Sequence, residues 1–173
     1  MRGLYFPENP MEVSSVLQWV AEKLGERTDI FHEPYAYCLL DEYRGILAGF
    51  VLHDYSGKNI SFSLAIVPGT IITPRLAHKV LSVPFNSPLD ACRVTAFVDE
   101  TNTRSVRLIQ TLGFKEEGRI RKHFGDRDAL VFGLLKEEFD GGRYGRRYEF
   151  RQGGGLREPD ARSSEHRAEV PTR

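Results

Sequence analysis

Two polar residues, Asn102 and Ser105, stand three positions apart at the start of a segment, 103–112, whose apolar residues recur at helical spacing. A serine hydroxyl at the entrance of a helix can donate a hydrogen bond or a proton to a leaving group, which is a general-acid role. It can equally be an ordinary residue of the first helical turn. Asn102 can position a ligand or cap the helix, a place where asparagine is favoured. The residue types leave both pairs of alternatives open.

Candidate proton acceptors are spread over three predicted strands: Ser61 and Ser63, His53 and Asp54, and Asp99 and Glu100. None of them stands out as a general base. A water relay can serve instead, because the reacting group of a substrate only has to lose one proton near neutral pH. No group of His, Cys and acidic residues has the spacing of a metal site, so the sequence predicts no metal.

The elements that must position these residues follow from the hydrophobic period and its punctuation. Thr73 is a predicted N-cap before Pro74, and Gly25 and Gly113 are predicted C-caps. Helices are predicted at 11–24, from Pro74 to before Pro84, and at 103–112; strands are predicted at 35–41, 45–54, 58–68, 92–100, 114–122 and 129–139. The first three of these strands suit an antiparallel meander.

Bulk properties indicate one soluble, cytoplasmic domain. The chain has 173 residues, 40% of them hydrophobic, and 24 basic residues balance 24 acidic ones. Both cysteines, Cys38 and Cys92, lie in apolar runs, so we expect buried, inert thiols rather than a disulfide. The longest apolar run, 46–52, is far below the roughly 20 residues that span a membrane. No membrane association is expected.

The composition divides the chain near residue 140. The body, 1–140, has a net charge of −3, whereas 141–173 holds eight arginines, five acidic residues and almost no aliphatic ones. Such a segment cannot bury enough surface to offset its ordering entropy, and we expect a disordered Gly/Arg-rich tail. Arginines alternate there with Tyr144, Tyr148 and Phe150, a pattern that can bind single-stranded nucleic acid. A solvated tail is the favoured interpretation.

The order Asn102, Ser105, Gly113–Phe114 and Glu117–Gly118 resembles the "N-x-x-S … L-G-F … E-G" signature of the Gcn5-related N-acetyltransferases. Within that superfamily it most resembles the branch that acetylates ribosomal proteins and other protein N-termini. The resemblance covers residues 3–139 and implies an α/β (α+β) fold, with a mixed twisted sheet of six to seven strands and three to four helices. It also implies acetyl-CoA as co-substrate and an amine as acceptor.

In such folds two neighbouring strands, here 61–67 and 93–99, separate and admit the pantetheine arm of the cofactor. The resemblance gives Ser105 the task of protonating the departing thiolate. The cofactor-binding residues that it implies are Ala65, Ile66, Val67, Gly69, Thr70, Ile71, Ile72, Thr73 and Asn102.

The chain departs from the family at the pyrophosphate loop, "Q/R-x-x-G-x-G/A". Gly69 is present, but Ile71 and Thr73 stand where glycines are expected. A β-branched residue resists the positive φ that lets successive amides surround a phosphate, so we expect a misshapen loop and weakened cofactor binding. The leading hypothesis is still an N-acetyltransferase, because the rest of the signature is present. The alternative is a non-catalytic protein of this fold, with a structural or accessory role such as that of a phage internal virion protein.

Overall fold

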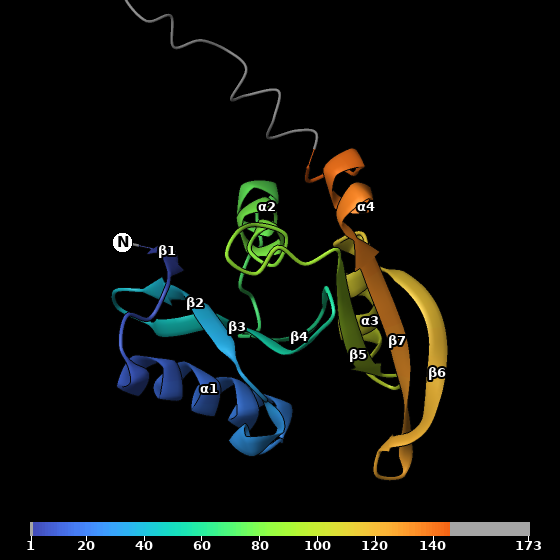
Figure 1. Cartoon of the computed structure of the whole chain (residues 1–173). Helices are drawn as coiled ribbons and strands as arrows, with labels where there is room; N and C mark the ends of the chain where they lie inside the picture. The colour runs from blue at the N-terminus through green and yellow to red at the C-terminus, as the bar shows by residue number, and fades with distance from the viewer. Residues whose placement is uncertain (1, 146–173) are drawn as a thin grey trace, which may run out of the picture.

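The computed structural model describes residues 2–145, which form a seven-stranded sheet with helices on both faces (Figure 1). The strands are β1 (Arg2–Tyr5), β2 (Tyr35–Asp41), β3 (Gly45–Ser56), β4 (Asn59–Ile66), β5 (Arg93–Asp99), β6 (Lys115–Phe124) and β7 (Arg127–Leu135). The helices are α1 (Pro10–Leu24), the short 3-10 turn η1 (Thr28–Ile30), α2 (Pro74–Ser82), α3 (Thr103–Thr111) and α4 (Lys136–Gly141).

The sheet is mixed, with strand order β1-β2-β3-β4-β5-β7-β6. Strands β2 to β4 form the predicted antiparallel meander, β1 pairs antiparallel with β2, and β4 and β5 are the parallel pair. Strand β7 lies between β5 and β6, antiparallel to both. This is the α/β architecture that the sequence predicted, with seven strands.

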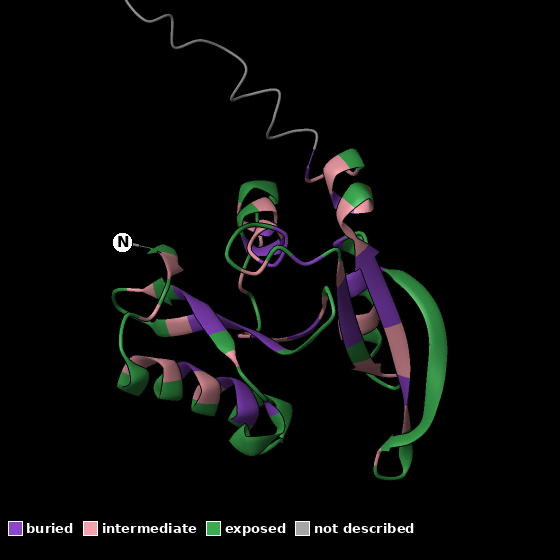
Figure 2. Cartoon of the chain, viewed as in Figure 1, coloured by how far each residue is buried: buried purple, intermediate pink, exposed green. Residues whose placement is uncertain are grey.

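Each face of the sheet has its own hydrophobic core. Helix α1 packs against β2, β3 and β4 on one face, where Gly49 of β3 lets the helix come close: a Cβ there would lie 3.1 Å from the ring of Trp19. Helices α2, α3 and α4 cover the other face, and the buried Tyr37 hydroxyl donates to the Val80 carbonyl of α2 at 2.9 Å. Figure 2 shows the buried residues along the central strands and the exposed edge strand β6.

The predicted helix ends are confirmed. Thr73 caps α2, because its Oγ1 accepts the Leu76 N–H at 3.2 Å, and Pro74 takes the first helical position. Gly25 ends α1 in the left-handed conformation, with φ of 71°. Gly113, with φ of 100°, follows α3.

Three predictions need correction or extension. The last strand does not reach Phe139: it ends at Leu135, where the Glu138 carboxylate accepts the Leu135 N–H at 3.1 Å and starts α4. Cys92 is exposed, because it precedes β5 instead of lying in it, whereas Cys38 is buried. Tyr144, assigned to the tail, packs on the core and donates its hydroxyl to the Thr111 carbonyl at 3.1 Å. The packed part of the chain therefore continues past residue 140, and the remaining tail prediction, for 146–173, lies outside the described residues.

Candidate functional site

The gap between β4 and β5 is the main feature of the candidate site. Only three residue pairs join the two strands, from Asn59↔Arg93 to Ser61↔Thr95, and beyond them the strands diverge (Figure 1). Residues 62–66 of β4 therefore have a strand partner on the β3 side only. An unpaired strand edge can take up an extended ligand by backbone hydrogen bonds. Ala65 and Ile66 lie on this edge, and Val67 follows it.

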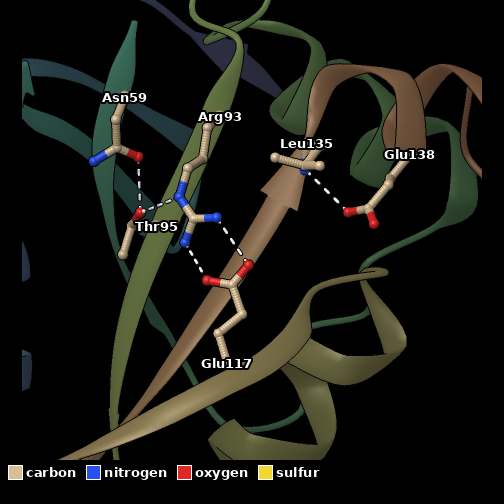
Figure 3. Close-up of polar contacts among 6 residues, drawn as sticks. All are labelled: Asn59, Arg93, Thr95, Glu117, Leu135 and Glu138. Atoms are coloured by element: carbon tan, nitrogen blue, oxygen red, sulfur yellow. Dashed lines mark hydrogen bonds and ion pairs between the residues drawn. The ribbon is translucent and has the colours of Figure 1, made fainter. Parts of the chain in front are cut away.

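A polar network closes the apex of the gap (Figure 3). Thr95 of β5 donates its hydroxyl to Asn59 Oδ1 of β4 at 2.8 Å and accepts from Arg93 Nε at 3.2 Å. The Arg93 guanidinium also donates to both carboxylate oxygens of Glu117, which sits in a β-bulge of β6. Arg93 holds the pKa of the Glu117 carboxyl below its ordinary value. The network ties β4, β5 and β6 together where the opening begins.

The loop after β4 is a tight turn followed by an extended segment. The Thr70 N–H donates to the Val67 carbonyl at 3.0 Å across Pro68–Gly69, and Gly69 has φ of 81°, as the third position of a type II turn requires. The Val67 N–H donates to the Leu47 carbonyl at 2.9 Å. Two amides of this loop thus bond within the chain.

Ile71 and Thr73, which stand where glycines were expected, are not among the described residues with positive φ. Ile71 is 69% exposed, and Thr73 is the cap of α2. Ile72, between them, packs partly buried against the core. The segment therefore enters the N-terminus of α2 in a conformation that non-glycine residues adopt without strain.

Asn102 is the N-cap of α3: its Oδ1 accepts the Ser105 N–H at 3.0 Å. The predicted cap is therefore present, and the predicted contact of Asn102 with the cofactor stays a prediction. Helix α3 follows the C-terminal end of β5 directly and contacts that strand, so Ser105, half-buried in its first turn, lies on the β5 side of the gap. The role of its hydroxyl stays a prediction.

The structure brings Ser63 together with His53 and Asp54, a pair that the sequence analysis placed on a different strand. His53 is 8% exposed; its Nδ1 lies 2.7 Å from Asp54 Oδ2 and its Nε2 lies 3.0 Å from Ser63 Oγ. The available signal was the pairing of β3 with β4, which places His53 opposite Ser61 and therefore on the same face as Ser63. By contrast, Asp99 and Glu100 form ion pairs with Arg127 and Arg119.

Within residues 2–145 no group of three or more His, Cys, Asp or Glu side chains could hold a metal ion. None of the helices described there is long and apolar enough to cross a membrane.

No protein-family model matches the chain, and no curated protein matches it by sequence. Solved structures do match it. A spermidine N-acetyltransferase from Vibrio cholerae in complex with CoA and spermine superposes with a TM-score of 0.62 at 17% identity, over 80% of this chain and 97% of that one. A dodecameric spermidine N-acetyltransferase from the same organism, in an intermediate state, gives 0.61 at 16% identity, over 80% and 95%.

These likenesses confirm the predicted fold: the chain has the fold of the Gcn5-related N-acetyltransferases. The similar structures are spermidine acetyltransferases, so the narrower resemblance to enzymes of ribosomal proteins and protein N-termini stays a prediction.

Proposed function

We propose that this chain is an acyl-CoA-dependent N-acetyltransferase that transfers acetyl to a primary amine. A protein N-terminus, a lysine or a small-molecule amine such as a polyamine would be the acceptor. The observation that carries the proposal is the short parallel pairing of β4 with β5, which leaves residues 62–66 with a free backbone edge at a strand gap. The complex of the similar enzyme with CoA and spermine supports both the cofactor and the acceptor class.

The residues around the gap fit the cofactor. Backbone groups of residues 62–66 would pair with the pantetheine arm. The segment from Gly69 to Thr73 leads to the N-terminus of α2, whose first turn has no acidic residue and carries Arg75. The partial positive charge of that helix end and the guanidinium both favour a pyrophosphate. Because the Val67 and Thr70 amides already bond within the chain, we expect weaker phosphate binding than a glycine-rich loop gives.

Bound coenzyme A would supply an activated acyl thioester. The chain would orient it so that an amine entering from the α1 side of the sheet reaches the carbonyl. Backbone amides near Ala65 and Ile66 would polarise the carbonyl oxygen, and the Ser105 hydroxyl would donate a proton to the thiolate that leaves.

The test is acetyl transfer, followed by mass spectrometry of the acceptor. The protein is incubated with acetyl-CoA and, separately, with spermidine, a lysine-free peptide with a free N-terminus, and an N-terminally blocked peptide that contains lysine. The proposal expects one acetyl group on at least one of the three, and transfer slowed by Ser105→Ala with little change in cofactor binding. Thr111→Ala, at the other end of α3, is the matched control.

A non-catalytic role in the same fold is the second candidate. The self-bonded loop 67–70 and the absence of glycine at residues 71 and 73 favour it. It expects no transfer to any of the three acceptors and no binding of acetyl-CoA.

A further inference from the structure

A buried histidine links an aspartate to a serine beside the strand gap. Asp54 in its ionised form can only accept a hydrogen bond, so the imidazole donates from Nδ1 to Asp54 Oδ2 over 2.7 Å. The Nε2 lone pair is thereby free to accept the Ser63 hydroxyl at 3.0 Å. The three side chains form one chain of hydrogen bonds with its acceptor end at the carboxylate.

An irregularity in β3 makes this arrangement possible. Side chains of successive residues in a regular strand point to opposite faces, so a histidine and the aspartate after it would be separated. Here the pairing with β4 shifts register between His53 and Ser56, and Asp54 has φ of 52°. The Asp54 N–H donates to the His32 carbonyl at 3.0 Å, which holds the turned backbone in place. Residues in such uncommon conformations persist where the surroundings fix them and gather at functional sites.

Ser63 stands where the gap opens. It lies two residues beyond Ser61, the last residue of β4 paired with β5, and its side chain is half-buried. Alternation along β4 places it on the same face as Asn59 and Ala65, and Ala65 packs under α1. This is the face opposite α2 and α3. A thioester lying along residues 62–66 would thus have Ser63 on one side and the first turn of α3 on the other.

The surroundings of His53 keep its imidazole neutral near pH 7. Burial lowers the pKa of His53 below its ordinary 6.5, Asp54 opposes this shift, and nearby His32 adds to it. Phe31 covers the ring edge-on, with centroids 5.0 Å apart. From β4 the neighbours are Ser61 and Ser63, which do not titrate in this range.

We propose that Ser63, His53 and Asp54 form the relay that takes the proton from the acceptor amine, an inference that rests on the proposed function. The amine nitrogen attacks the thioester carbonyl and a C–N bond forms. Ser63 Oγ takes the proton from that nitrogen while its own hydroxyl proton moves to His53 Nε2, and Asp54 stabilises the imidazolium. The C–S bond breaks, the thiolate picks up a proton from Ser105, which regains one from water, and the imidazolium returns its proton to water through Ser63.

The test is steady-state kinetics on the full-length protein. The substrates are acetyl-CoA and whichever of spermidine and the two peptides the wild-type protein acetylates. His53→Gln and Ser63→Ala should each lower kcat about 10²- to 10⁴-fold. The wild-type pH profile of kcat should fall on the acid side with a midpoint below 6.5, and His53→Gln should lose this acid limb. Ser63→Thr keeps the hydroxyl and should recover much of the rate. Thr111→Ala, at the far end of α3 and away from the strand gap, is the control and should leave kcat unchanged.

The outcomes separate the two proposals. A wild-type protein that acetylates none of the three acceptors contradicts both of them. An active wild type whose His53→Gln and Ser63→Ala variants bind acetyl-CoA normally and keep the wild-type kcat and acid limb overturns the relay alone. An acetyl group found on Ser63 after incubation with acetyl-CoA would also overturn it, in favour of a covalent serine intermediate. If His53→Gln fails to fold, Ser63→Ala and Ser63→Thr decide the question.

Discussion

The ion pair between Arg93 and Glu117 crosses strand β7 directly over Gly133. Arg93 lies on β5 and Glu117 on β6, the two neighbours of β7, and Arg93 Nη1 donates to Glu117 Oε1 at 2.8 Å. A Cβ on Gly133 would lie 2.7 Å from Arg93 Nη2 and closer still to Glu117 Oε1. The missing side chain in β7 therefore allows the network at the apex of the gap to form.

We predict that Gly133→Ala displaces this ion pair and destabilises the fold by about 1–3 kcal/mol, as overpacking does elsewhere. The measurement is urea unfolding. Gly118→Ala in β6 is the control, because nothing lies within 4 Å of its added Cβ and its φ is not positive. Glu117→Ala should reduce the cost of Gly133→Ala in the double variant. Equal stability of the two alanine variants would contradict the steric account.

The free energy of unfolding should depend on pH through His53. Burial lowers the pKa of His53 in the folded state below 6.5, whereas the unfolded chain titrates near that value, so the unfolded state binds more protons between the two pKa values. Stability should rise with pH through this window and be lost as the pH falls through it. Unfolding measured from about pH 5 to pH 8 should show a smaller slope for His53→Gln than for wild type. Identical slopes would mean that the imidazole titrates alike in both states.

Two truncations should test how much the C-terminal segment contributes to stability. Removing residues 146–173 should change the melting temperature by about 1–2 °C at most, since their composition supports no core. Removing residues 142–173 also deletes Tyr144, which donates to the Thr111 carbonyl at 3.1 Å and accepts from His78 Nδ1 at 2.8 Å. Two lost hydrogen bonds should lower the melting temperature by roughly 2–8 °C. Thermal unfolding of both truncations checks this, and equal losses would refute it.

The two thiols should differ in reactivity. Cys92 is exposed, whereas Cys38 is buried and burial raises its pKa to about 11. Titration of the native protein with a chromogenic disulfide should therefore give one fast thiol, and titration in denaturant two. Cys92→Ser should remove the fast phase. A fast phase that survives in Cys92→Ser would show that Cys38 is reachable in the native fold.

Local signals in the sequence predicted most of the fold. Periodicity and caps such as Thr73 with Pro74 placed the helices, and alternation placed the meander, because these features depend on neighbours along the chain. The end of the last strand was missed because the prediction carried the strand through the charged residues 136–138 to Phe139. In the structure the Glu138 carboxylate accepts the Leu135 N–H, and a helix starts there.

The candidate site was predictable only in part. The cap role of Asn102 follows from its type and position. The contact between His53 and Asp54 does not, because it needs a left-handed residue inside a strand, and neither does the crossing over Gly133, which depends on β7 lying between β5 and β6. For Ser105 and the segment from Ala65 to Thr73, the binding roles stay predictions.

The most direct test of the central claim is calorimetric titration with acetyl-CoA, compared with acetyl-pantetheine, which lacks the pyrophosphate. We predict that the wild-type protein binds acetyl-CoA. At a ligand concentration 100 times the dissociation constant, binding should stabilise the folded state against unfolding by about 2.7 kcal/mol. Arg75→Glu at the start of α2 should weaken acetyl-CoA about tenfold, or about 1.4 kcal/mol, and leave acetyl-pantetheine unchanged. The matched charge reversal of the exposed Arg107 of α3, Arg107→Glu, should change neither affinity. No binding of either ligand to wild type, at any concentration up to millimolar, would contradict the acyltransferase account.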